Sequence, residues 1–167
     1  MRPGKILHPQ VASALASLGH GDIILVTDAG APIPEHANRI DLAFCAGSVD
    51  LLEILRVLLQ EIFVENVIFA EEVPENNPRL LECVTQIFTG SGADFTLIPH
   101  QELVSSVYGK AKVIIRSGSL MPWGNFGLVA STDPDAWFDE SMKKIPEYIE
   151  RSNRIKNKAV PAINKSH

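Results

Sequence analysis

The sequence predicts an α/β fold with a mostly parallel central sheet, helices on both faces in a three-layer arrangement, and a C-terminal helical extension. Short apolar runs rich in β-branched residues, such as residues 23–26 and 113–115, are typical of strands buried on both faces. Helical patterns alternate with these runs along the chain, which favours parallel strands joined by helices. The 167 residues favour one α/β domain over residues 1–130, followed by the extension over residues 131–167.

The first half of the chain predicts alternating helices and strands. Apolar residues at helical spacing predict a first helix, and they are Val11, Ala14, Leu15 and Leu18. Gly19 ends this helix. The strands predicted next are residues 22–27, 39–44 and 66–70. A helix that Ser48 and Asp50 can cap precedes the third strand, and its apolar face runs from Leu51 to Ile62.

The second half continues this alternation. Asn77 with Pro78 opens a helix that Gly90 closes. A short helix is predicted at residues 99–108. The strands predicted here are residues 94–98, 112–116 and 126–130. We expect residues 126–130 to form the last strand of the chain.

The extension differs in composition from the rest of the chain. Asp133 with Pro134 predicts the start of a helix. The apolar residues that this helix would carry are Trp137, Phe138 and Met142. Pro146 must interrupt or restart it. The end of the extension, residues 151–167, is basic and polar and is expected to fray.

Charge and hydropathy argue against two classes of partner. The chain has 20 acidic and 15 basic residues, a net charge of −5, whereas nucleic-acid and anionic-membrane binders need clustered Lys and Arg. The longest apolar segment, residues 51–63, is interrupted by charges and is shorter than the ~20 residues of a membrane span. We therefore expect neither a nucleic-acid partner nor a membrane partner.

Cysteines, histidines and the N-terminus favour a cytoplasmic protein without a metal. Cys45 and Cys83 lie far apart with no metal-type spacing, which predicts two reduced, partly buried thiols. No apolar segment follows the basic residues Arg2 and Lys5, so no signal peptide is expected. No metal site is expected, because no zinc-type spacing links the histidines His8, His20, His36 and His100.

Polar residues follow the predicted strands at their carboxyl ends, which is where open α/β sheets bind ligands. These residues are Asp28, Glu71, Glu72, His100, Gln101 and Arg116. A site assembled from them would be polar and would bind hydroxyl groups. Each also has an ordinary alternative: Asp28 as a turn former, the glutamates as a solvated strand end, His100 as a helix cap, and the Arg116 segment as a plain turn.

His20 precedes its strand and does not follow this pattern. Histidine titrates near neutral pH and can act as an acid or a base. Eight residues separate His20 from Asp28, and at ~3.3 Å per residue an extended chain would place them roughly 26 Å apart. Either the chain curls at Gly19 and Gly21, or the site joins two copies of the protein, and we favour the second. The ordinary alternative is that His20 satisfies the C-terminus of the first helix.

Trp123 lies in a loop beside Gly124 and Asn125. It belongs either to the core or to a platform on which a sugar ring stacks. The platform is favoured slightly, because an aromatic face covers apolar C–H groups and a neighbouring amide pairs with hydroxyl groups.

Taken in chain order, these segments resemble the D-ribose pyranase and L-fucose mutarotase family. The matching segments are residues 18–22, 28–34, 39–41, 70–72, 77–78, 100, 115–118 and 123–125. They span roughly residues 4–130. Each motif is weak alone, and the resemblance rests on their order.

The resemblance implies a ring-shaped homo-oligomer of α/β subunits with active sites between neighbours. It also implies the interconversion of cyclic forms of a free monosaccharide such as D-ribose or L-fucose (pyranose and furanose, or two anomers) without a cofactor or metal. By this resemblance His20 looks like the catalytic acid. The residues that look like sugar-binding positions are Asp28, His100, Trp123 and Asn125.

Departures from the family pattern leave the sugar open. The family usually has Tyr where this chain has Trp123, and an indole donates a hydrogen bond but accepts none. Its ribose branch usually has Glu where Ser119 stands here, whereas Gly124 and Asn125 resemble the fucose branch. These departures keep an alternative open, namely a non-catalytic sugar-binding module linked to sugar uptake or regulation.

Overall fold

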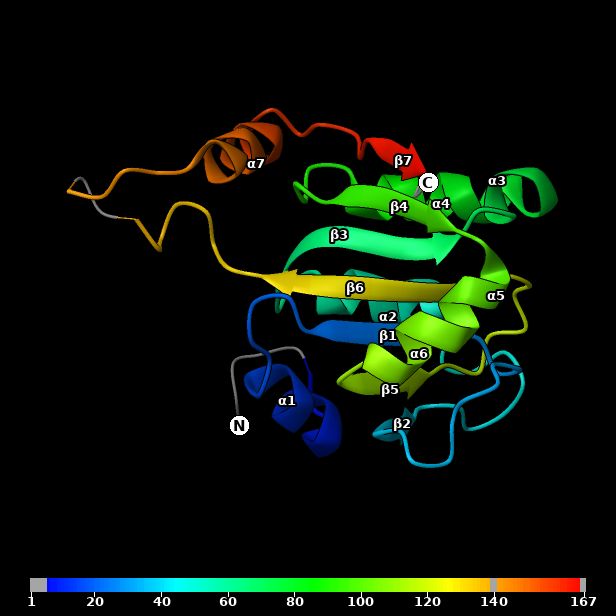
Figure 1. The fold of residues 1–167 in the computed structure, drawn as a ribbon. Helices are drawn as coiled ribbons and strands as arrows, with labels where there is room; N and C mark the ends of the chain where they lie inside the picture. Colours follow the sequence, from blue (N-terminus) through cyan, green and yellow to red (C-terminus); the bar gives the residue numbers. More distant parts are fainter. Residues whose placement is uncertain (1–5, 139–140, 166–167) are drawn as a thin grey trace.

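The computed structural model describes residues 6–138 and 141–165, so Arg2 and Lys5 lie outside it. Within these residues, the centre of the molecule is a seven-stranded sheet in the order β2-β5-β1-β6-β3-β4-β7 (Figure 1). β6 runs antiparallel to its neighbours β1 and β3, whereas the other paired strands run parallel. The sheet is therefore mostly parallel, as the sequence predicts.

The predicted strands are present, with changes at their ends. In chain order the strands are β1 (Ile23–Thr27), β2 (Arg39–Asp41), β3 (Phe63–Ala70), β4 (Asp94–Ile98), β5 (Val113–Arg116), β6 (Asn125–Ser131) and β7 (Ile163–Lys165). β2 stops at Asp41, and residues 42–44 leave the sheet. The expectation that residues 126–130 form the last strand is wrong, because β6 lies inside the sheet and β7 follows it.

Helices cover both faces of the sheet. They are α1 (Pro9–Ala16), α2 (Leu51–Leu58), α3 (Val73–Asn76), α4 (Pro78–Phe88), α5 (His100–Glu102), the π-helical segment η1 (Leu103–Val107), α6 (Tyr108–Lys110) and α7 (Pro146–Lys156). In Figure 1, α2 and α4 lie behind the sheet, and α5 and α6 lie in front of it. This confirms the three-layer α/β prediction. Within the described residues, no helix combines the length and the apolar composition that crossing a membrane requires.

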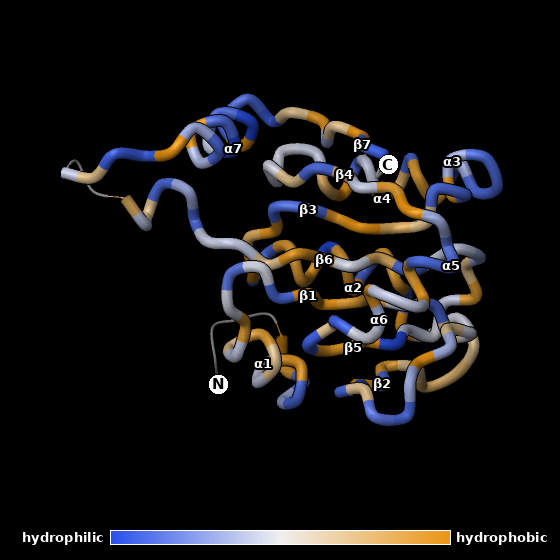
Figure 2. The backbone as a smooth tube through the Cα atoms, viewed as in Figure 1, coloured by the Kyte–Doolittle hydropathy of each residue, from blue (hydrophilic) through white to orange (hydrophobic). Residues whose placement is uncertain are grey.

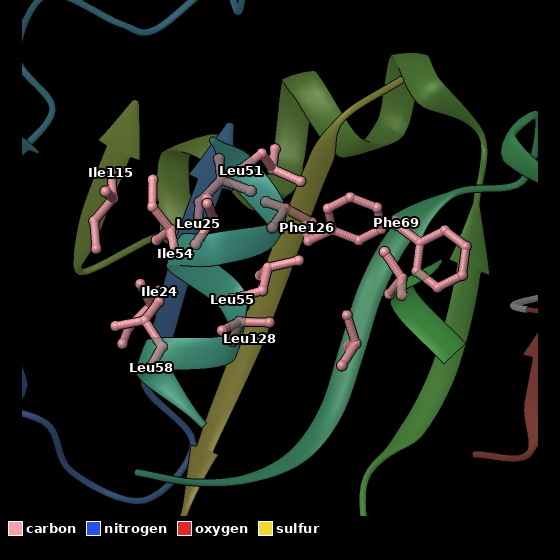
Figure 3. Close-up of a cluster of buried hydrophobic side chains, with 14 of the residues drawn as sticks. Ile24, Leu25, Leu51, Ile54, Leu55, Leu58, Phe69, Ile115, Phe126 and Leu128 are labelled. Atoms are coloured by element: carbon pink, nitrogen blue, oxygen red, sulfur yellow. The ribbon is translucent and has the colours of Figure 1, made fainter. Parts of the chain in front are cut away.

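α2 anchors one face of the sheet. Asp50 caps it, since its carboxylate accepts the backbone N–H groups of Leu52 at 2.9 Å and Glu53 at 3.3 Å. Its buried residues recur at helical spacing and are Leu51, Ile54, Leu55 and Leu58. Figure 3 shows them packed against the buried side chains of β1 and β6. This packing fixes β1, and with it the residues at both of its ends.

On the other face, η1 lies close to β6. A Cβ added at Gly127 of β6 would lie only 3.1 Å from Cγ1 of Val107, so glycine permits this approach. Tyr108 follows η1 directly and is buried. The close approach therefore places the phenol of Tyr108 beside Asn125, at the start of β6.

The extension departs from its prediction before α7. Asp133 accepts two backbone N–H donors, as a helix cap would. The described residues between Asp133 and α7 nevertheless form turns and no helix, so the helix expected there is wrong. The physical reason is that Trp137 and Met142 are exposed, and a short helix needs an apolar face packed on the domain. α7 begins at Pro146, at the predicted restart.

The end of the chain is more ordered than expected. Residues 163–165 form β7, which adds to β4 in parallel, whereas residues 166 and 167 lie outside the described range. Figure 2 shows α7 as a mainly hydrophilic helix. Its buried residues are Arg151 and Ser152. Polar contacts therefore attach α7 to the domain.

Candidate active site

The edge at which the parallel strands end, here called the carboxyl edge, gathers most of the predicted site residues. Asp28 follows β1, and His100 follows β4. Because β6 runs antiparallel, Trp123 and Asn125 at its start lie at the same edge. We call these four residues the carboxyl-edge cluster.

Direct contacts link the members of the cluster. Nδ2 of Asn125 donates to Oδ2 of Asp28 at 3.3 Å. The rings of His100 and Trp123 meet edge to face with their centroids 5.1 Å apart. A Cβ added at Gly124 would lie 3.5 Å from Cβ of Asp28, so the loop that carries Trp123 packs on Asp28. The structure thus brings all four residues together within one chain.

Asp28 both forms a turn and faces the cluster. Its Oδ1 accepts the N–H of Gly30 at 2.8 Å, which matches the turn-former alternative. Its Oδ2 accepts from Asn125 and keeps further acceptor capacity. Burial raises the pKa of Asp28, and the hydrogen bonds from Gly30 and Asn125 oppose this rise. The turn orients a carboxylate that can still accept the hydrogen of a hydroxyl group.

A buried tyrosine orients Asn125. The hydroxyl of Tyr108 donates to Oδ1 of Asn125 at 3.0 Å, which leaves Nδ2 to face Asp28. Burial raises the pKa of Tyr108, so the hydroxyl stays a donor at neutral pH. Sequence reasoning missed this residue. The available signal was a tyrosine at the end of a predicted helix, because a buried phenol requires a hydrogen-bond partner.

His100 and Trp123 form the aromatic side of the cluster. The N–H of His100 donates to both carboxylate oxygens of Glu72, at 3.1 and 3.2 Å. Nδ1 of His100 is buried and has no hydrogen-bond partner among the described residues. Trp123 is partly buried rather than exposed, and its φ of 68° lies in the left-handed region that bulky residues rarely adopt. Contacts to the core and to His100 hold it there.

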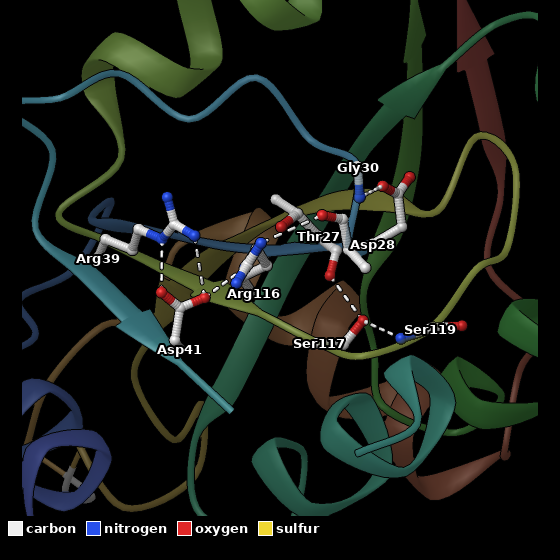
Figure 4. A network of polar contacts seen from close by, with 9 residues as sticks. Thr27, Asp28, Gly30, Arg39, Asp41, Arg116, Ser117 and Ser119 are labelled. Carbon is white, nitrogen blue, oxygen red and sulfur yellow. Dashed lines mark hydrogen bonds and ion pairs between the residues drawn. The ribbon is translucent and has the colours of Figure 1, made fainter. Parts of the chain in front are cut away.

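Arg116 is engaged in structural contacts next to the cluster. Its guanidinium pairs with Asp41, and Nε of Arg39 pairs with the same carboxylate at 2.7 Å (Figure 4). Nη1 of Arg116 also donates to the carbonyl of Ala29 at 3.3 Å. These contacts tie β2, β5 and the loop after β1 together.

His20 lies at the opposite edge of the sheet, here called the amino edge. Its Nε2 is 3.3 Å from a carboxylate oxygen of Glu65, and its Nδ1 is 3.3 Å from the hydroxyl of Tyr148. The chain does not curl back toward Asp28, since the N–H of Gly21 pairs with the carbonyl of Ala130 at the end of β6. Within one chain, His20 and Asp28 are therefore separated by the full length of β1.

A pocket of about 520 Å³ opens beside His20. Its walls come from the end of α1, the start of β3 and the extension, to which Trp137 and Tyr148 belong. Sequence reasoning placed no site residue in the extension. The signal that could have found Tyr148 is weak, because a tyrosine in a polar helix is common.

The part of the chain that the structure describes contains neither a cluster of metal ligands nor a disulfide. No group of three or more His, Cys, Asp and Glu side chains is arranged there to hold a metal ion. Cys45 and Cys83 are both free thiols. Cys45 is exposed rather than partly buried, which corrects the expectation for that residue.

The fold and the carboxyl-edge cluster define a small α/β protein that gathers a carboxylate, an amide, an imidazole and an indole at one edge of its sheet. Residues 1–132 match the sequence model of the RbsD / FucU transport protein family. This match covers well over half of the chain. The chain belongs to that family.

Individual relatives agree with this assignment. The D-ribose pyranase 1 of Streptomyces griseus subsp. griseus is 42% identical over 147 residues, which are 88% of this chain and 96% of the relative. The structure of Bacillus subtilis RbsD complexed with D-ribose matches with a TM-score of 0.74 and 32% identity, over 79% of this chain and 98% of that one. The fucose mutarotase from Streptococcus pneumoniae, in complex with L-fucose, matches with a TM-score of 0.64 and 25% identity, over 74% and 92%.

Proposed function

We propose that this protein is an isomerase that interconverts cyclic forms of a free monosaccharide, with D-ribose as the first candidate. The observation that carries the proposal is the 42% identity to a D-ribose pyranase over 96% of that relative's length. The structural match to RbsD in complex with D-ribose supports the same substrate class. The likeness to a fucose mutarotase keeps L-fucose as the second sugar to test.

The chemistry suits the residue types that the chain presents. Interconversion of ring forms opens a hemiacetal, so a proton must reach the ring oxygen while another leaves the anomeric hydroxyl. We assign this transfer to His20, because histidine can give and take a proton near neutral pH. Such general acid–base help accelerates a reaction by roughly 10²–10⁴-fold. That is sufficient for a reaction that already proceeds slowly in water.

The carboxyl-edge cluster is proposed to hold the sugar. Asp28 accepts from one hydroxyl, and the amide of Asn125 pairs with its neighbour. His100 binds a further hydroxyl, and the ring of Trp123 covers the C–H face of the sugar. These roles fit the contacts described above, in which each side chain is already oriented by another group.

We further propose that His20 of one subunit and the carboxyl-edge cluster of its neighbour form one active site in a ring-shaped homo-oligomer. The separation of His20 from Asp28 along β1 supports this arrangement. Exposed apolar residues support it as well, because Phe44 is 90% and Leu120 71% exposed in loops at the carboxyl edge. Such residues are typical of surfaces that a partner covers.

The binding-module alternative is less favoured, because the curated relatives carry the name of a reaction. For the cell compartment we propose the cytoplasm, where the free thiols of Cys45 and Cys83 would stay reduced.

Saturation-transfer NMR on free sugars tests the proposal. The wild-type protein should speed the exchange between ring forms of D-ribose or, failing that, of L-fucose, and His20→Ala should abolish the effect. Exchange that is unchanged while the sugar binds would favour the binding module. If no sugar in a panel of pentoses and deoxyhexoses binds, and none exchanges faster, both functions are excluded.

A further inference from the structure

The extension brings a phenol to His20. The hydroxyl of Tyr148, in the first turn of α7, lies 3.3 Å from Nδ1 of His20, although 128 residues separate the two in sequence. Their rings are 6.4 Å apart and tilted by 37°. A second hydroxyl, that of Thr132, lies 3.1 Å from the same phenol oxygen. Tyr148 is thus part of a hydrogen-bonded chain that ends on the imidazole.

The position of Tyr148 is well defined. Phe138 meets its ring edge to face at 4.9 Å, and the guanidinium carbon of Arg151 lies 4.8 Å from the ring centroid. Arg151 is itself nearly buried, at 9% exposure, and donates to the carbonyl of Thr132 at 2.8 Å. The phenol is therefore held by several contacts rather than by its hydroxyl alone.

Glu65 of β3 holds the other nitrogen of His20. Its Oε2 lies 3.3 Å from Nε2 of His20, and the same oxygen accepts from Arg151 at 3.0 Å and from Ser131 at 2.8 Å. An ionised carboxylate only accepts hydrogen bonds. The negative carboxylate therefore favours the tautomer with its hydrogen on Nε2, and in that tautomer Nδ1 accepts from the Tyr148 hydroxyl.

The two sides of the imidazole differ in access. His20 and Tyr148 both line the pocket of about 520 Å³. Glu65 and Arg151 line a different pocket, together with residues of α7 and β4. Nδ1 therefore lies toward Tyr148, on the side of the pocket that both residues line, and Nε2 lies toward Glu65.

We propose that Tyr148 and Glu65 are positioning residues for His20, which together favour the Nε2–H tautomer and fix the imidazole at the wall of the pocket. This inference rests on the proposed role of His20 as the catalytic acid. A carboxylate that orients a histidine from behind is a recurring device of acid–base catalysis. Here the second support comes from the extension, so residues 131–165 contribute to the site as well as to the sheet.

The tautomer can be measured without any sugar. In protein labelled with ¹⁵N-histidine, long-range ¹H–¹⁵N spectra separate the two nitrogens of each ring, and His20→Ala assigns the signals of His20. The wild type should show His20 as the Nε2–H tautomer. Tyr148→Phe keeps the ring contacts to Phe138 and Arg151 but should move the Nδ1 signal, and Glu65→Gln should give a mixture of tautomers.

Ser152→Ala is the matched control. Ser152 lies on the same helix, and its hydroxyl donates to Asp135 at 3.0 Å without touching His20. Both variants remove one hydroxyl that helps to hold the extension, but only Tyr148→Phe removes the contact to Nδ1. Ser152→Ala should therefore leave the His20 signals unchanged.

Exchange kinetics give the second measurement. Tyr148→Phe should lower kcat by about fivefold, the value of one net hydrogen bond, with KM little changed, whereas Ser152→Ala should keep the wild-type kcat. Unchanged Nδ1 signals and kcat in Tyr148→Phe, or equal losses in both variants, would overturn the positioning role. If the wild type exchanges no sugar, the proposed function fails, and the NMR signals of the sugar-free protein still decide whether Tyr148 and Glu65 hold the tautomer.

Discussion

Mixed oligomers test whether His20 and Asp28 of different chains make one site. Chains with His20→Ala and chains with Asp28→Asn each lack one half of every site, so each variant alone should lose activity. Asp28→Asn keeps a side-chain oxygen for the N–H of Gly30, which lies 2.8 Å from the carboxylate, and the turn should persist. Rings that contain both variants should recover activity.

The expected recovery follows from the placement of the two residues at opposite edges of the sheet. In an equal mixture, a site that draws His20 from one chain and Asp28 from its neighbour is complete in about a quarter of cases, since each half is intact with a chance of about one half. A site formed within one chain would never be complete, because every chain lacks one of the two residues. A shared site therefore predicts that the mixture recovers about a quarter of the wild-type rate, whereas a site within one chain predicts no recovery.

The assay uses co-expressed chains with two different affinity tags, purified over both tags, and exchange rates from saturation-transfer NMR. A control ring mixes the wild type with the double variant His20→Ala/Asp28→Asn. The shared site predicts about a quarter of the wild-type rate in this control, and a single-chain site predicts about half. No recovery in the variant mixture, with half the rate in the control, would refute the shared site.

Three further predictions follow from the described contacts. Tyr108→Phe leaves the buried Oδ1 of Asn125 without its donor, at a cost of about 1–3 kcal/mol, and should raise KM for the sugar in the exchange assay while lowering Tm. In Gly118→Ala the new Cβ would lie 1.7 Å from a backbone oxygen, so calorimetry should show a loss of about 3 kcal/mol, or roughly 6–12 °C in Tm, whereas Gly109→Ala, with nothing within 4 Å, should be neutral. Burial raises the folded-state pKa of Asp28 above 3.8. The stability that the protonated carboxyl group contributes is therefore complete below that pH and is lost as the pH rises through the folded pKa. Asp28→Asn should raise Tm at pH 7 but not below pH 3.8, and an equal gain at both pH values would contradict this.

The centre of the sheet could be predicted because strands such as β1 and β5 are short, apolar and buried on both faces. β1 and β5 are recognisable from composition alone, since few other structures bury such runs. β7 could not be found this way, because its residues are exposed and its place beside β4 depends on where α7 directs the chain. The helix expected after Asp133 failed for a different reason, since a good capping residue cannot hold a short helix when Trp137 and Met142, two of its three apolar side chains, stay exposed.

The site could be predicted as far as chain length and strand direction allow. The distance along β1 already separates His20 from Asp28, and the rule for carboxyl ends places Asp28 and His100 at one edge. Sequence reasoning could not provide the supporting partners. Tyr108 and Tyr148 act across 17 and 128 residues of chain, and such contacts follow from packing rather than from local pattern.

The reversed direction of β6 explains how one small chain could contribute to the two half-sites of the proposed ring. Because β6 starts at the carboxyl edge, it delivers Asn125 to Asp28 there. It then crosses the sheet between β1 and β3 and ends at the amino edge with Ser131, whose hydroxyl donates to Glu65. A parallel strand at this place would have put Asn125 beside His20 and the start of the extension beside Asp28. Among the described strands β6 alone runs antiparallel, and it places the proposed sugar-binding groups at one edge and the contacts of His20 at the other. This arrangement suits the proposed ring, in which opposite edges of neighbouring subunits would meet.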